Sequence, residues 1–135
     1  MVIGNKPPTL VYLAYKFSNS PTENTKKARK MAINLMKKYP NWIIVSPHFA
    51  VDALLDGVVD WTHMKDEDFS QWRRIQAGYM AACFLSRCDI MILGCKPTYT
   101  ESSGVTWEYI IVKMLNSSWR KNKPIKVMTY DEAMQ

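Results

Sequence analysis

The stretch Asp89 to Tyr109, DIMILGCKPTYTESSGVTWEY, decides the fold predicted for this sequence. It opens with the apolar run 90–93, which Gly94 ends, and a helix is expected to begin near Ser102 after a polar loop. A short apolar run that leads through a loop into a helix is typical of a buried strand in an α/β protein. Free backbone N–H groups and the helix dipole attract anions to such a helix start, and a glycine lets a ligand approach the backbone closely. The stretch therefore predicts a site for an anionic ligand.

Length and composition limit the class of protein. The chain has 135 residues, of which 47% are hydrophobic, and this size fits one domain spanning residues 1–135. The net charge of +6 favours a phosphate-bearing partner without distinguishing a nucleotide from a nucleic acid. Cys83, Cys88 and Cys95 form no CxxC pair and have no matching histidine cluster, which favours reduced thiols over a zinc site or disulfides. Because no apolar run fits a signal peptide or a membrane span, we expect a cytoplasmic protein without a metal.

The remaining chain alternates between strand and helix patterns. Strands are expected near residues 9–15, 42–46, 89–93 and 125–128, with helical periodicity between them. Ser20 to Glu23, SPTE, is a capping box with proline at the first helical position, and Pro40 marks the end of that helix. A second long helix is expected over Lys65 to Arg87, whereas the segment 50–62 fits either a short helix or a flap over the site. The alternation predicts an α/β fold, a doubly wound Rossmann- or flavodoxin-like parallel sheet flanked by helices.

Two residues outside the central stretch are candidates for ligand contact. His48 follows the second strand, and the carboxyl ends of parallel strands line the ligand crevice in open sheets; a structural histidine is the alternative. Arg74 lies near a helix start, where the dipole disfavours a cation, so we expect it to meet a ligand, an acidic partner, another subunit or solvent. The sequence has neither GxGxxG after its first strand nor GxxxxGK[ST] anywhere, which disfavours a standard dinucleotide or P-loop site. We expect no bound cofactor.

Four groups of residues give the sequence a resemblance to a known superfamily. They are Tyr12-Leu13-Ala14, Ser46-Pro47-His48, Cys88-Asp89-Ile90 and the spacing Ser102-x-Gly104-x-x-x-Glu108. In this order they resemble the nucleoside 2-deoxyribosyltransferase-like superfamily. That group includes deoxynucleoside 5′-monophosphate N-glycosidases and many small, uncharacterised, often phage-borne domains. The similarity runs from about Val11 to Val127, nearly the whole chain.

The resemblance implies a role for each matching residue. Glu108 matches the nucleophile that attacks the anomeric carbon and expels the base, and Tyr12 matches the tyrosine that orients this carboxylate. Ser102 and Gly104 match positions at which monophosphate-preferring members bind phosphate. A carboxylate that forms a covalent glycosyl intermediate is also the chemistry of retaining glycosidases. By the same resemblance, the residues expected to contact the ligand are Ala14, His48, Arg74, Ser102, Ser103 and Gly104.

One position departs from the family pattern. Family enzymes usually carry an aspartate eight residues before the aspartate of the third strand, where it helps the base to leave, and here that position is Ala81. Without a group that protonates the base, expulsion loses a general-acid contribution of about a hundredfold or more. His48, or an aspartate of the segment Asp56 to Asp68, is an alternative proton donor.

Two functions remain open on the sequence alone. The first is an enzyme that cleaves or exchanges the N-glycosidic bond of a nucleoside or nucleotide. The second is a non-catalytic binder that sequesters a nucleotide-derived signalling molecule, as a phage protein directed against host defence would. A nucleic-acid-binding module is a third and weaker interpretation, because the sequence lacks the expected aromatic and basic strand pattern and a recognition helix. The resemblance also implies a homodimer or larger homo-oligomer.

Overall fold

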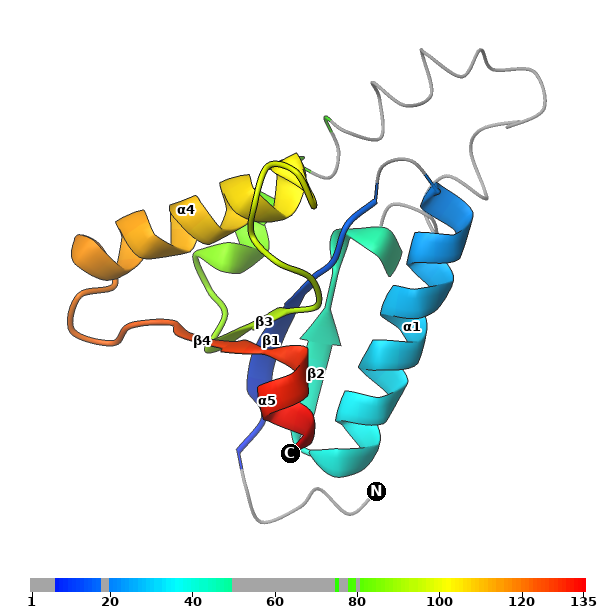
Figure 1. Ribbon diagram of the computed structural model, residues 1–135. Coiled ribbons are helices and arrows are strands. Elements are labelled where there is room, and N and C mark those ends of the chain that lie inside the picture. Colours follow the sequence, from blue (N-terminus) through cyan, green and yellow to red (C-terminus); the bar gives the residue numbers. More distant parts are fainter. Residues whose placement is uncertain (1–6, 18–19, 50–74, 76–77, 80) are drawn as a thin grey trace.

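The computed structural model describes residues 7–17, 20–49, 75, 78–79 and 81–135 (Figure 1). The described part of the chain forms one parallel β-sheet with helices packed against both of its faces. The predictions for the segment 50–62 and for Arg74 lie outside the described residues.

Four strands form the sheet, in the order β2-β1-β3-β4, and every neighbouring pair is parallel. Tyr12 lies opposite Val45 on one side and Met91 on the other, so β1 is a central strand. This order is typical of doubly wound α/β folds and confirms the predicted fold class. β3 is also interior, as its apolar run 90–93 predicts. The strands are β1 (Thr9–Ala14), β2 (Trp42–Val45), β3 (Ile90–Leu93) and β4 (Lys126–Thr129).

Successive residues of β1 and β3 contribute to two separate cores, because side chains alternate between the faces of a strand. Tyr12 and Met91 belong to the core under α4, which we call the α4 face. Leu13 and Ile92 belong to the core under α1 and α5, which we call the α1 face. All four of these side chains are fully buried. Figure 1 shows α4 and α1 on opposite sides of the sheet.

The helix α1 (Pro21–Lys38) covers the α1 face with its apolar stripe, and it ends before Pro40 as predicted. The predicted capping box at its start is wrong. Ser20 has a ψ of 69° instead of the extended value usual for an N-cap, and its side chain caps no backbone N–H. Glu23 forms an exposed ion pair with Lys26 instead of reaching back to Ser20.

The helix α4 (Ser103–Ser117) begins where the central stretch predicts a helix, with Ser102 as its N-cap. The Ser102 hydroxyl accepts a hydrogen bond from the backbone N–H of Val105 at 3.2 Å. Asn116, in the last turn, donates to the Ile125 carbonyl at 2.9 Å and accepts from the Ile125 N–H at 2.8 Å. One amide side chain therefore joins the end of α4 to the chain entering β4.

Sequence reasoning missed the helix α5 (Tyr130–Met134). The pattern Thr129-x-x-Glu132 forms a complete capping box, in which each side chain hydrogen-bonds the other residue's backbone N–H. The far end of α5 is held by α1, because the Tyr39 hydroxyl donates to the Ala133 carbonyl at 2.6 Å.

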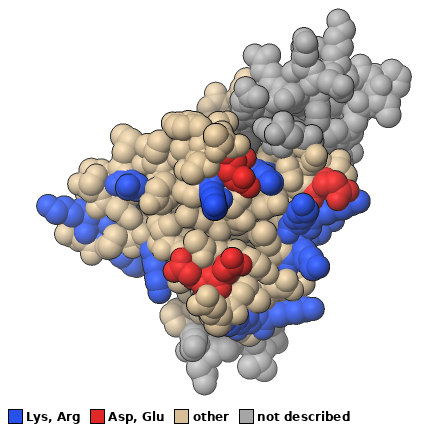
Figure 2. Space-filling model, in the orientation of Figure 1, with Lys and Arg blue, Asp and Glu red and all other residues tan. Residues whose placement is uncertain are grey.

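The outer surface of α1 is basic, and basic side chains gather over this helix in Figure 2. Its exposed cations are Lys26, Lys27, Arg29, Lys30, Lys37 and Lys38. Among the described residues, no helix combines the length and the apolar character that crossing a membrane requires.

Replacing a central core side chain should destabilise the protein strongly. For Ile92→Ala we expect the free energy of unfolding to fall by about 2–5 kcal/mol, because Ile92 is fully buried in the interior strand β3. The matched control is Ile33→Ala on α1, where the isoleucine is 44% exposed, with an expected change within about 0.5 kcal/mol. Urea titration followed by circular dichroism measures both, and equal effects would contradict the assignment of the core.

Candidate functional site

Tyr12 and Glu108 come from the two elements that enclose the α4 face. Tyr12 points from the middle of β1 into this core and is fully buried. Glu108 lies in the second turn of α4, and its Oε2 atom is buried although the residue as a whole is partly exposed. The fold thus brings together two polar groups separated by most of the chain, as the resemblance implies for a nucleophile and the tyrosine that orients it.

The two groups influence each other without forming a hydrogen bond of standard geometry. Burial is the main cause that raises the pKa of Glu108 to about 7, and hydrogen bonding from Tyr12 acts in the opposite direction. Burial also raises the pKa of Tyr12 well above its usual range, and the nearby Glu108 carboxylate adds to this rise. At standard distances and angles, neither the Tyr12 hydroxyl nor Glu108 Oε2 has a partner among the described residues. The contact is loose, and both atoms retain hydrogen-bonding capacity for a ligand.

Ionisation near neutral pH makes Glu108 chemically versatile. A carboxyl group with a pKa of about 7 is present in both protonation states under ordinary conditions. The ionised form can act as a nucleophile or a general base, and the protonated form can donate a proton. Tyr12 remains a neutral phenol that can donate to the carboxylate or to a ligand.

The start of α4 offers a place for an anion close to Glu108. The backbone N–H groups of Ser103 and Gly104 lie in the first turn, where an α-helix provides no internal acceptor. Of the described part of the chain, a Cβ atom on Gly104 would meet only the Ser102 hydroxyl, at 3.9 Å, so these residues leave space beside this backbone. Ser102 and Glu108 are about 9 Å apart along the helix axis. Because helical side chains tilt toward the N-terminus, the Glu108 carboxyl leans back toward this end.

His48 lies at the carboxyl end of β2, as predicted, but its ring forms part of the protein framework. It is buried, with Nδ1 3.0 Å from the Thr25 hydroxyl and Nε2 2.9 Å from the Tyr15 carbonyl. Since a carbonyl can only accept, the neutral ring carries its proton on Nε2 and accepts from Thr25 at Nδ1. His48 therefore ties the loop after β1 to α1. Ligand contact by His48 remains a prediction.

Of the remaining positions at which the sequence predicts a role in the site, two lie in the α4-face core and the others lie outside the described residues. Ala14 ends β1 in the α4-face core, and its carbonyl accepts from the Gly94 N–H at 2.8 Å. Ala81 is buried in the same core as Tyr12, so the position that departs from the family pattern is close-packed and apolar. Arg74 and the segment 56–68, with its alternative proton donors, lie outside the described residues.

Sequence reasoning gave no role to three residues at the carboxyl edge of the sheet. Ser46, directly after β2, is buried and its hydroxyl has no partner among the described residues. Lys16, two residues after β1, forms an ion pair with Glu101, which precedes the N-cap of α4. The sequence offered one indication of a role for them, which is their position: Ser46 and Lys16 follow parallel strands, and Glu101 precedes a helix. The apolar alternation of the strands gave no information about which polar side chains would face each other.

Within the described ranges, no group of three or more histidine, cysteine or acidic residues is arranged to hold a metal ion. No protein-family model matches the sequence, and no curated protein or solved structure shows a significant match to it. The residues themselves must therefore carry any functional argument.

The buried Glu108 carboxyl should make stability depend on pH. Its folded pKa of about 7 lies above the ordinary value of 4.5, so protons bind the folded state more tightly. Stability should fall as pH rises from about 4.5 to about 7, by up to about 3 kcal/mol, and then level off. Glu108→Gln cannot ionise at this position. Its free energy of unfolding should therefore match that of the wild type near pH 5 and exceed it at pH 8.

Urea titrations across this pH range measure the difference between Glu108→Gln and the wild type. The control is Glu23→Gln on the exposed surface of α1, whose stability relative to wild type should not follow this profile. A difference between Glu108→Gln and wild type that stays constant from pH 5 to pH 8 would show that Glu108 is not buried in this way.

Proposed function

We propose that this protein binds a nucleoside or nucleotide, in the cytoplasm of a bacterial or phage-infected cell, and that Glu108 acts on the N-glycosidic bond. The observation that carries the proposal is the buried pair of Tyr12 and Glu108, whose polar atoms lack standard partners among the described residues. Burying such groups unsatisfied costs free energy, which a functional site explains better than a structural role does. The resemblance to the nucleoside 2-deoxyribosyltransferase-like superfamily supports the same assignment.

The proposed chemistry uses Glu108 as a nucleophile. Its ionised carboxylate attacks the anomeric carbon, a C–O bond forms, and the C–N bond breaks with its electron pair leaving on the base. Water then attacks the anomeric carbon of the glycosyl ester and releases Glu108, or a second base accepts the sugar. Tyr12 orients the carboxylate, and the amides at the start of α4 bind a phosphate of the substrate.

Ala81 favours a second candidate function, a non-catalytic binder of a nucleotide-derived molecule. The buried methyl of Ala81 offers no proton to the leaving base. Apart from Glu108, the described side chains packed around Tyr12 in the α4-face core include no carboxyl group and no histidine. We therefore expect base release to be slow or absent, with solvent as the proton source.

Base release from nucleosides and nucleoside monophosphates, followed by chromatography, separates the two candidates. We expect turnover well below about one per second, a rate typical of ordinary enzymes. Any turnover should increase about tenfold from pH 6 to pH 8, because Glu108 ionises over this range, and Glu108→Ala should abolish it. Turnover at about one per second or faster that depends on Glu108 would show a working glycosidase. Tight binding with no turnover in wild type or Glu108→Ala would favour sequestration.

Phosphate binding at the start of α4 can be tested separately from catalysis. Ser102→Asp keeps a good N-cap but adds a negative charge, so calorimetry should show weaker binding of nucleoside monophosphates by about tenfold or more. The control is Ser117→Asp at the opposite end of α4, which should leave affinity unchanged. Equal affinities of Ser102→Asp and wild type would exclude phosphate from this helix start.

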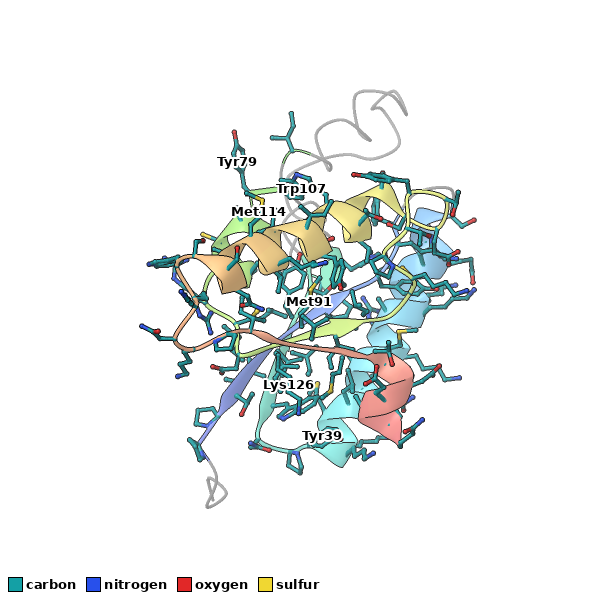
Figure 3. All side chains as sticks on the ribbon, turned by 60° about the vertical axis from the view of Figure 1, so that its left-hand side comes forward. Tyr39, Tyr79, Met91, Trp107, Met114 and Lys126 are labelled. Carbon is teal, nitrogen blue, oxygen red and sulfur yellow. The ribbon has the colours of Figure 1, made fainter. Side chains whose placement is uncertain are left out.

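We also propose a homodimer or larger homo-oligomer, with a second copy packed on the outer face of α4. Trp107, Ile110 and Met114 are 48%, 40% and 64% exposed, and their spacing places them along one face of the helix. Figure 3 shows Trp107 and Met114 on the outer side of α4. This outward face carries one charged residue, Lys113, whereas the outer face of α1 carries six cations. A helix that is apolar on both sides is normally buried on both, and two positively charged copies would approach most easily through this face.

Met114→Lys should shift the protein toward the monomer, since it places a charge in the proposed contact at its most exposed apolar side chain. Light scattering coupled to size exclusion measures the mass at matched concentrations. The control is Met36→Lys on α1, where the methionine is 51% exposed and should not affect assembly. A wild-type monomer at high micromolar concentration would contradict the proposed oligomer.

A further inference from the structure

The chain joins the carboxyl end of β1 to the start of α4 through one ion pair. Lys16 Nζ lies 3.1 Å from Glu101 Oε1, a contact that spans 85 positions in the sequence. Both side chains are about one-third exposed, at 34% and 39%. The order β2-β1-β3-β4 places this contact at the point where the chain winding reverses, and open α/β sheets bind ligands in the crevice there.

The ion pair and the buried Glu108 share a neighbour. Cys95, two residues after β3, has a pKa that burial raises and that a hydrogen bond from the Lys16 backbone N–H lowers. Glu101 and Glu108 both raise the pKa of the same thiol. Charges of the ion pair and of Glu108 therefore act on the same thiol, which lies after the strand next to β1.

Glu101 stands where an anionic ligand group would approach. It directly precedes the N-cap Ser102 in the sequence, and α4 begins with backbone N–H groups that have no acceptor within the helix. The first turn of α4 contains no acidic residue of its own. Water screens an exposed ion pair, so a ligand phosphate with nearly two negative charges can displace Glu101 from Lys16 at little cost.

We propose that Lys16 is the residue that selects phosphorylated ligands, and that Glu101 occupies it until the phosphate arrives. This assignment rests on the proposed nucleotide-binding function and adds the source of its phosphate preference. Ser46, at the carboxyl end of the neighbouring strand β2, is buried with a hydroxyl that has no partner among the described residues, which indicates independently that a polar ligand group belongs at this edge of the sheet. Ligand binding exchanges one ion pair for another, and Glu101 is released to solvent.

The first test compares four deoxynucleosides with their 5′-monophosphates by calorimetry, with inorganic phosphate as a further probe. Lys16→Met should weaken binding of the monophosphates by about tenfold or more and leave the nucleosides unchanged. Lys37→Met is the control: it removes the same charge from the last turn of α1 and should change neither. Inorganic phosphate alone should compete with the monophosphates and lose affinity in Lys16→Met.

The second test removes the competing carboxylate. Glu101→Gln should tighten monophosphate binding by about twofold to fivefold, because Lys16 no longer has an internal anion. In the double variant Lys16→Met/Glu101→Gln this gain should disappear, since the two residues act on the same phosphate. Weaker binding in Glu101→Gln would show that Glu101 itself holds the ligand.

The outcomes distinguish this inference from the function on which it rests. If the wild type binds no nucleoside or nucleotide, the proposed function and the role of Lys16 fail together. If it binds nucleotides and Lys16→Met keeps the full preference for the monophosphate, only the assignment of Lys16 fails. If Glu101→Gln tightened monophosphate binding equally with and without Lys16, the proposed exchange of ion pairs would be wrong.

Discussion

The arrangement of this protein depends on β1 being buried on both faces. A parallel sheet has helices over both sides, so every side chain of its central strand must enter one core or the other. Val11 and Leu13 pack in the core of the α1 face. Tyr12 and Ala14 pack in the core of the α4 face. Tyr12 thus places a hydroxyl inside an otherwise apolar layer. The site is built from the same strand that holds the two cores together.

Burying a carboxyl group in that layer works against folding, and the surrounding packing must offset it. The raised pKa of Glu108 reflects this cost, since burial favours the neutral form of its carboxyl group. Tyr12 lowers the pKa of Glu108 and so offsets part of this effect, but the two groups form no hydrogen bond of standard geometry. A ligand that supplied the missing donors and acceptors would stabilise the folded state as it bound.

The sequence was informative wherever hydrophobic burial decided the structure. The four apolar runs predicted the strands of a parallel sheet, and the stop at Gly94 followed by Ser102 predicted the start of α4. Capping was harder, because the same pattern forms at Thr129 and fails at Ser20, where the backbone angle differs. The ion pair of Lys16 with Glu101 could not be predicted, since it depends on how two loops meet in space. The resemblance indicated Tyr12 and Glu108 as partners, but only the packing of α4 on β1 accounts for the perturbed pKa of Glu108.

The amide of Asn116 makes the junction of α4 and β4 sensitive to the exchange of a single side-chain group. It donates to one backbone group of Ile125 and accepts from another, so both ends of the amide are needed. Hydrolysis of this side chain to aspartate would replace the donor with an oxygen that faces the Ile125 carbonyl. The new negative charge would also lie in the last turn of α4, where the helix dipole disfavours it. The entry into β4 would therefore loosen beside β3, because one hydrogen bond with Ile125 would be replaced by two facing oxygen atoms.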